Sequence, residues 1–191
     1  MGTLFVAGHS VFVNGQTAPN RMSIRSGDTV ATGSTSSAKV TLRGGSIQLD
    51  ENTNVNFLGN IGNYLGCTLI ATLNTGQTFT EGKNICVSAG GVLFAPQSKY
   101  LSKRIPEGEV LAVLAVAEGE VIMSDAEQTL VATTLTQASI VGGRISEQHP
   151  ISEAELHSIT GWRNQYAFKS ASGGTSPAAP VRAVSALTPV R

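Results

Sequence analysis

The sequence predicts an all-β domain that carries one amphipathic helix near its C-terminus and ends in a flexible tail. Three observations lead to this fold class. Short segments with alternating apolar and polar residues recur about every eight residues, the 191-residue chain holds 21 glycines, and a helical pattern occurs only once, after Pro150. Evenly spaced short strands are typical of a sandwich or of a short β-solenoid, and both architectures remain open at this point.

The first predicted strands lie at 4–7 and 11–13. The pair Asn14-Gly15 follows the second strand, and it indicates a tight hairpin turn because both residue types tolerate positive φ. A polar stretch through Pro19 and Asn20 comes next.

A regular pattern begins at residue 28. We predict four strands separated by turns, at 28–31, 39–42, 46–49 and 54–57. In the last three of them the apolar residues fall at every second position, as Val40 and Leu42 do. Each of these strands therefore presents one apolar and one polar face, as a sheet buried on one side requires.

Strands continue into the second half of the chain. Further short strands are predicted at 68–73, 77–80, 85–88, 92–95 and 121–123. The stretch 109–117 is nearly all apolar, which predicts a central strand buried on both faces. The last full strand is expected at 130–135, and Gly142-Gly143 is expected to close the β region, so we place the β domain at 1–145.

The pattern changes to helical spacing beyond Pro150. Ser152 and Glu155 have the spacing of a capping box, in which each side chain binds a free backbone N–H group of the first turn. The residues of the apolar stripe that follows are Leu156, Ile159, Trp162 and Tyr166. We predict an amphipathic helix over about 153–168, within a segment 150–169 that packs on the β domain.

Two features of the C-terminal region bear on possible contacts with a partner: the residue Trp162 and the tail 170–191. Trp162 is interpreted as a core residue, with a role as a binding anchor as the alternative. Residues 170–191 are mainly Ala, Ser, Gly, Pro and Val with two arginines, a low-complexity composition that does not fold alone, and we expect this tail to cross onto a neighbouring molecule. The candidate partner contacts are Trp162, Tyr166, Pro177, Pro180 and Pro189.

Charge is sparse and balanced along the chain. Hydrophobic residues make up 41% and charged residues 14%, and 13 Lys and Arg balance 13 Asp and Glu. A neutral chain has no long-range field to gather phosphates, so we expect no nucleic-acid partner. No apolar run of about 18 residues is present, so we expect no membrane insertion. Weak self-repulsion suits a chain that packs against itself or against another protein of an assembly.

No signal peptide is visible at Met1-Gly2-Thr3, because no basic segment precedes the first apolar strand. Two localisations stay open. The protein is used without export, for example in a virion or another assembly, or it is periplasmic or at the cell surface and its signal has been removed.

Cys67 and Cys86 flank what we predict to be a β-hairpin. In an oxidising compartment the two can pair, and closing so short a loop contributes about 3 kcal/mol on the loop-entropy model. The alternative is two buried thiols that pack as small apolar side chains, which the missing export signal favours.

The segment Ile24–Leu42 reads IRSGDTVATGSTSSAKVTL and resembles the FecR domain. That family tends to run G-D-x-[IV]-x-T-G-x-x-S-x-A, followed by an Asp-Gly-Ser turn and a strand. Gly45-Ser46 stands where this turn belongs, with Gly44 in place of the usual acidic residue. The resemblance covers about residues 12–57, is weak over 68–121 and does not include the tail.

The resemblance implies a β-rich extracytoplasmic domain without catalytic activity. In iron-uptake regulators the FecR domain takes part in signal transfer between an outer-membrane receptor and a sigma factor. Those regulators also carry an anti-sigma segment and a membrane helix, and this sequence matches neither. The resemblance therefore extends to the domain and not to the whole regulator.

No constellation of side chains predicts catalysis, a cofactor or a metal site. The histidines are not spaced as a metal pair on one face, and each aspartate falls in a predicted turn. These residues are His9, His149, His157, Asp28, Asp50 and Asp125. Residues 50–54 imitate the start of a calcium loop, but Val55 and Ile61 replace the glycine and the glutamate that the loop requires.

We expect a non-enzymatic structural or interaction protein that packs into a larger assembly, such as a homo-oligomer, a surface filament or a phage virion. The first alternative is an extracytoplasmic FecR-like signalling or adaptor module that binds an envelope protein. The second alternative is a glycan-binding module.

Overall fold

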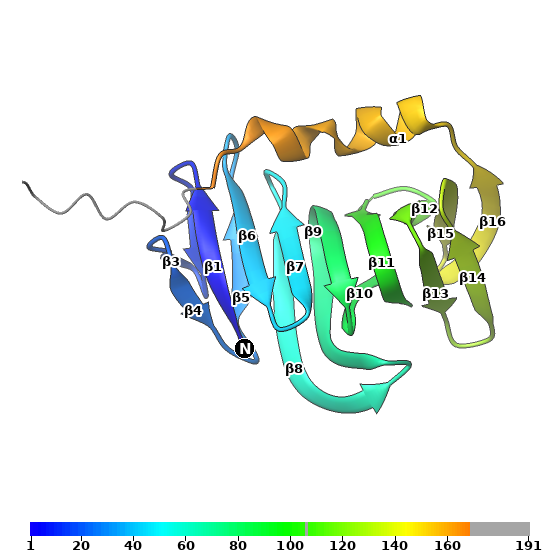
Figure 1. Cartoon of the computed structure of the whole chain (residues 1–191), viewed down its shortest axis with the longest axis horizontal. Helices are drawn as coiled ribbons and strands as arrows, with labels where there is room; N and C mark the ends of the chain where they lie inside the picture. The colour runs from blue at the N-terminus through cyan, green and yellow to red at the C-terminus, as the bar shows by residue number, and fades with distance from the viewer. Residues whose placement is uncertain (106, 169–191) are drawn as a thin grey trace, which may run out of the picture.

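The computed structural model describes residues 1–105 and 107–168. These residues form 16 strands, an α-helix and a 3-10 helix (Figure 1). The strands make one hydrogen-bonded network, which divides into two sheets because β9 (Cys67–Lys83) and β11 (Val92–Arg104) each pass from one sheet into the other. The predicted all-β fold class with a single C-terminal helical segment is confirmed for the described residues.

Sheet A contains the second halves of β9 and β11. Its strand order is β4 (Met22–Ile24), β1 (Gly2–Ala7), β6 (Ser37–Leu42), β7 (Gly45–Leu49), β9, β11, β12 (Val110–Glu118), β15 (Thr136–Val141) and β16 (Arg144–Pro150). All of these neighbours are antiparallel.

Sheet B contains the first halves of β9 and β11. Its strand order is β3 (Gln16–Thr17), β2 (Val11–Val13), β5 (Thr29–Thr32), β8 (Asn54–Tyr64), β9, β10 (Ile85–Ala89), β11, β13 (Glu120–Ser124) and β14 (Thr129–Thr133). Only β9 and β10 run parallel, with Ile85 beside Leu69, because the chain passes through sheet A between them. The sandwich therefore includes one solenoid-like turn.

The bend that carries β9 between the sheets lies at Gly76. This glycine has φ of +82°, and a Cβ at this position would lie 2.3 Å from Oγ1 and 2.6 Å from Cα of Thr53. Only glycine meets both conditions without displacing the connection between β7 and β8, to which Thr53 belongs. For this reason the two strands predicted at 68–73 and 77–80 are one strand of 17 residues.

The main hydrophobic core lies between the two sheets. Val40 and Ile47 of sheet A and Val55 and Phe57 of sheet B are fully buried in it, as their alternation predicts. β12 is buried on both faces over its centre, since Leu114 packs in the main core while Ala115, on the other face, packs beneath the helix. The prediction for 109–117 holds for this part of the strand.

Several predicted boundaries were wrong. Gly142-Gly143 does not close the β region but forms the turn between β15 and β16, so strands continue past residue 145 to Pro150. The strand predicted at 130–135 ends at Thr133. The short strands β3 and β4 were not predicted; β3 consists of only the two polar residues Gln16 and Thr17, which carry no apolar alternation.

The helical segment begins with the predicted capping box. Ser152 and Glu155 bind each other's backbone N–H groups, and α1 spans Glu153–Thr160. Gly161 ends the α-helix, consistent with its low helix propensity, and the chain continues as the 3-10 helix η1 (Gly161–Gln165) instead of one helix to residue 168. Together α1 and η1 run across the strands of sheet A, from the β16 side to the β1 side (Figure 1).

Within residues 1–105 and 107–168, no helix is both long enough and apolar enough to cross a lipid bilayer.

Candidate interaction surfaces

The residues of the FecR-like segment hold strands together. Gly27 has φ of +92°, and the Asp28 carboxylate accepts hydrogen bonds from the Arg25 backbone N–H at 2.7 Å and from Asn14 Nδ2 at 2.8 Å. Thr32 Oγ1 donates to the Asp50 carbonyl and accepts from the Thr53 N–H at 3.0 Å. The motif therefore serves the turn structure that joins β2, β5 and the β7–β8 connection.

Cys67 and Cys86 form a disulfide, with their Cα atoms 5.7 Å apart. Both residues are almost fully buried, at 0% and 1% exposed. The expectation that they flank a β-hairpin was wrong, because they lie on the parallel neighbours β9 and β10. The disulfide thus closes the solenoid-like turn of chain that passes through sheet A.

Trp162 is a core residue and not an exposed anchor. Its side chain is 8% exposed and packs with Phe79, Leu101 and Ala115 of sheet A, supported by Leu156 and Ile159 among others. This position does not suit the proposed role of Trp162 as a partner contact, because a buried indole has no surface to offer.

The other candidate partner contacts divide into two groups. Tyr166 is half-buried, and desolvation, followed by the charges of Asp50 and Glu51, raises the pKa of its hydroxyl. Pro177, Pro180 and Pro189 lie outside the described residues.

The carboxylates singled out in the sequence serve structural roles. Asp50 is buried and accepts a hydrogen bond from Gln77 Nε2 at 2.5 Å; burial raises the pKa of its carboxyl, and this hydrogen bond opposes the increase. Asp125 accepts hydrogen bonds from the backbone N–H groups of Ile145, Glu127 and Gln128, which lower its pKa to about 2. In the part of the chain that the structure describes, no three His, Cys, Asp or Glu residues gather as a metal site.

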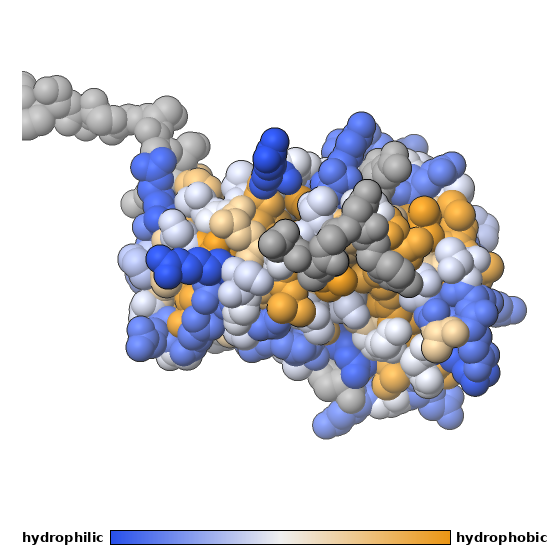
Figure 2. Space-filling model, turned by 90° about the horizontal axis from the view of Figure 1, so that it is seen from below, coloured by the Kyte–Doolittle hydropathy of each residue, from blue (hydrophilic) through white to orange (hydrophobic). Residues whose placement is uncertain are grey.

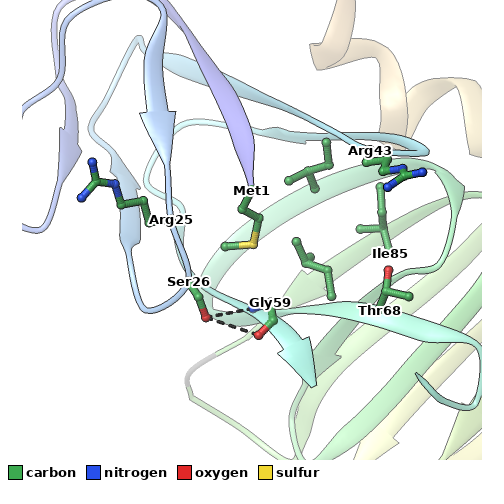
Figure 3. A pocket seen from close by; sticks show the side chains of 9 residues that line it. Met1, Arg25, Ser26, Arg43, Gly59, Thr68 and Ile85 are labelled. Carbon is green, nitrogen blue, oxygen red and sulfur yellow. Dashed lines mark hydrogen bonds between the residues drawn. The ribbon is translucent and has the colours of Figure 1, made fainter. Parts of the chain in front are cut away.

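A hollow of about 380 Å³ opens between the two sheets beside the β8–β9 hairpin. Its wall is mixed, with Leu42, Leu69 and Ile85 among the apolar residues and Arg25, Arg43 and Thr68 among the polar ones. At its edge Ser26 Oγ accepts a hydrogen bond from the Gly59 N–H at 3.1 Å. Figure 3 shows the side chains of Arg25 and Arg43 on opposite sides of it. Among the described residues that line it, the hollow offers apolar contact but no pairing of a nucleophile with a base.

The outer face of sheet A carries the helix. One row of paired residues crosses eight strands of this face: Phe5, Lys39, Gln48, Phe79, Leu101, Ala115, Gln137 and His149. The helical segment lies over the centre of this row, and Gln48 Nε2 donates to the Arg163 carbonyl at 3.2 Å. Charged side chains of neighbouring rows, such as Glu81, Lys99 and Lys103, share this face.

The outer face of sheet B differs from that of sheet A, because two adjacent rows of residues paired across its strands contain no charged side chain. The first row is Thr29, Asn56, Thr72, Ser88, Leu93, Ser124 and Thr129. The second row is Leu58, Ile70, Cys86, Ala95, Ile122 and Val131. We call these two rows the uncharged face.

The apolar row of the uncharged face is partly open to solvent. Leu58 is 42% exposed at one end and Val131 is 50% exposed at the other, and Leu65 at the tip of the β8–β9 hairpin is 38% exposed. Figure 2 views the molecule from the side on which this hairpin lies and shows hydrophobic side chains gathered there. Between these ends the row is buried, since Cys86 and Ala95 are 1% and 3% exposed, so its exposed apolar surface is divided between the two ends.

Sequence comparison identifies no relative: no protein-family model matches the chain, and no curated protein matches it. Two crystal structures of a candidate anti-sigma factor from Parabacteroides distasonis have a similar fold, with TM-scores of 0.55 and 0.57 at 15% identity over 71% of this chain. The match spans 64% and 63% of those chains, which is just under two thirds of their length. At this identity the likeness establishes a shared fold.

Proposed function

We propose that this chain is a non-enzymatic, extracytoplasmic signalling or adaptor module of the FecR type, which binds another protein of the cell envelope. The observation that carries the proposal is the fold shared with candidate anti-sigma factors over 71% of the chain. The FecR-like segment supports it independently, because Gly27, Asp28 and Thr32 occupy positions where their residue types are structurally required.

The disulfide supports a location outside the reducing cytoplasm. Structural disulfides persist in the periplasm and at cell surfaces and are rare where thiols are kept reduced. The buried pair Cys67–Cys86 belongs to the fold itself and is not an exposed regulatory pair.

The redox state of these cysteines in living cells tests the location. Cells are quenched in acid, and free thiols are labelled with a polyethylene-glycol maleimide before and after reduction. We expect no label before reduction and two labels after it. Two labels before reduction would mean that the protein works in a reducing compartment and would overturn the extracytoplasmic assignment.

Photo-crosslinking in the native host tests the adaptor role. A photoreactive amino acid is placed at Val131, on the uncharged face, and in a second strain at Asn164, which is exposed on the helical side. We expect a crosslink to one envelope protein from one face only, identified by mass spectrometry. Failure to obtain a crosslink to a different protein from either face would overturn the adaptor role.

A second candidate function is the packing of this chain into an assembly of its own copies, such as a homo-oligomer, a surface filament or a virion. One specific observation favours it: the two rows of the uncharged face present no charge that a partner would have to neutralise.

A further inference from the structure

β14 is the last strand of sheet B, and within the described part of the chain it pairs only with β13. Its other side is an open edge of the sheet, where backbone N–H and C=O groups meet water. Three of its five residues are exposed: Thr129, Val131 and Thr133, with Val131 at 50%.

Hydrogen bonds at the two ends of β13 and β14 show which backbone groups face this edge. The Asp125 N–H donates to the Gln128 carbonyl at 3.1 Å, and the Gly119 N–H donates to Thr134 Oγ1 at 2.9 Å. In an antiparallel pair, opposite residues that share hydrogen bonds alternate with opposite residues that do not. Counted inwards from either end, the second and fourth residues of β14 bond to β13, so the N–H and C=O groups of its three exposed residues point to the open side. We call these groups the β14 edge.

The other strands that end the two described sheets are unsuited to pairing with a further strand. β3 and β4 have only two and three residues. β16 has seven residues, but a bulge breaks its register with β15, and it carries Arg144, Glu147 and Pro150. Short strands, bulges, charges and prolines are the features that keep other strands away from a sheet edge. β14 has no charge, proline, glycine or register shift.

We infer that an extended segment of the partner protein adds to sheet B as a further strand beside β14. This inference rests on the adaptor role and states how the partner is held.

The spacing of the groups on the β14 edge selects an extended polypeptide as the occupant. Outward N–H and C=O groups recur at every second residue, which is about every 7 Å along the strand. Another extended chain presents its own acceptors and donors at the same interval, and pairing with three residues forms about six hydrogen bonds. In strand addition these main-chain bonds provide affinity, and alternate side chains provide specificity.

The side chains of β14 define what the added segment must contain. Leu130 packs against the main core but is only partly buried, next to the fully buried Ala132. A neighbouring strand places every second side chain on this same inner face, so apolar residues there would cover Leu130. Its other side chains would lie beside the β-branched Thr129, Val131 and Thr133, which favour cross-strand pairs. We therefore expect an extended segment with apolar residues at every second position and no proline.

Photo-crosslinking of the full chain in the native host tests the geometry of this contact. Benzoylphenylalanine replaces Thr129 in one strain and Thr133 in another, and the crosslinked residues of the partner are mapped by mass spectrometry. Paired strands advance together by about 3.4 Å per residue, so we expect the two crosslinks to fall in one segment of one protein, about four residues apart. Crosslinks to separate segments, or to a second copy of this chain, overturn the inference.

A proline at the centre of the β14 edge tests whether backbone groups hold the partner. Val131→Pro removes an outward N–H and leaves the bonds to β13 in place. Thr17→Pro is the matched control, because the Ala18 N–H donates to the Val11 carbonyl and Thr17 therefore faces the open edge of β3, at the far end of sheet B. Val131→Thr is the second control, since it keeps the β-branched shape and every backbone group. We expect Val131→Pro to lower the crosslink yield from Thr133 at least about tenfold and both controls to stay within about twofold of the parent.

The melting temperature of each purified variant shows whether it folds. A folded Val131→Pro chain that crosslinks as well as the parent overturns strand addition and leaves the adaptor role in place. If Val131→Pro does not fold, the spacing of the crosslinks from Thr129 and Thr133 decides alone. Crosslinks from Asn164 but from neither position of β14 also overturn strand addition only, whereas no crosslink to a different protein from any position overturns the adaptor role as well.

Discussion

The guanidinium carbon of Arg163 lies 3.5 Å from the centre of the Phe79 ring. Nη2 of the same side chain donates to Oε1 of Glu81 at 2.6 Å, and the backbone carbonyl of Arg163 accepts from Gln48. Arg163 therefore joins η1 to both β7 and β9. The side chains of Arg163 and Glu81 are 28% and 34% exposed, so water screens this ion pair only in part.

Replacing Arg163 with alanine is expected to lower the free energy of unfolding by about 1–2 kcal/mol, because a cation–π contact and a partly shielded ion pair are lost together. Arg163→Lys is expected to recover only part of this, since an ammonium group lacks the planar surface that stacks on Phe79. Urea denaturation provides the measurement. Asn164→Ala, exposed on the same 3-10 helix, is the control and is expected to change stability by less than about 0.5 kcal/mol.

Truncation of Trp162 to alanine is expected to cost about 3–5 kcal/mol, because it leaves a cavity between the helix and sheet A. Thermal unfolding of Trp162→Ala and of the milder Trp162→Phe measures this loss. A cost below about 1 kcal/mol for the alanine variant would mean that the helix contributes little to the fold.

The same residue also reports on how the helix is attached. Trp162 is the only tryptophan of the chain, so its fluorescence follows the docking of the helical segment. We expect its emission to shift at the same urea concentration at which the β-sheet signal is lost in circular dichroism. An earlier shift would show that the helix undocks before the sandwich unfolds.

The strands of the first half could be predicted because their burial is periodic. Val40 and Leu42 face the core, while the alternate residues Lys39 and Thr41 do not, and this contrast is visible in the sequence. β16 carries no such signal, since Ile145 is its only buried residue. Its place in the sheet follows from pairing with β15, which a local pattern does not encode.

Contacts between distant parts of the chain could not be predicted. Arg163 and Glu81 are 82 residues apart, and neither position is unusual in the sequence. The uncharged face is hidden for a related reason. Its Thr, Ser and Asn residues are scattered between Thr29 and Thr129, and only the strand registers place them in one row. The capping box of Ser152 and Glu155 could be predicted because it is entirely local.

Removal of the disulfide is expected to lower the free energy of unfolding by about 3 kcal/mol, as expected for a cross-link that closes a loop of this size. Cys67 and Cys86 are separated by 19 positions. The double variant Cys67→Ala/Cys86→Ala is compared with the parent by urea denaturation, with and without reductant. We expect reductant to bring the parent close to the variant and to leave the variant unchanged. Full reduction of the parent without a loss of stability would show that the cross-link does not stabilise this fold.

Asp125 is expected to make stability depend on pH in the acid range. Hydrogen bonds from the backbone N–H groups of Ile145, Glu127 and Gln128 lower the pKa of Asp125 from 3.8 to about 2. The folded chain therefore binds this proton more weakly than the unfolded chain does. The ionised carboxylate thus stabilises the fold above pH of about 4, and this contribution is lost as the pH falls towards about 2.

Asp125→Asn provides the test, because an amide offers a single acceptor oxygen and its NH2 group faces a backbone donor. We expect the parent to have the higher melting temperature at pH 7, and we expect the difference to shrink as the pH falls from about 4 to about 2. Glu109→Gln, which replaces an exposed carboxylate outside the β13–β14 turn, is the control and is expected to leave the melting temperature at pH 7 nearly unchanged. A constant difference between parent and Asp125→Asn over this range would mean that the carboxylate ties the β13–β14 turn to β16 through its shape and not through its charge.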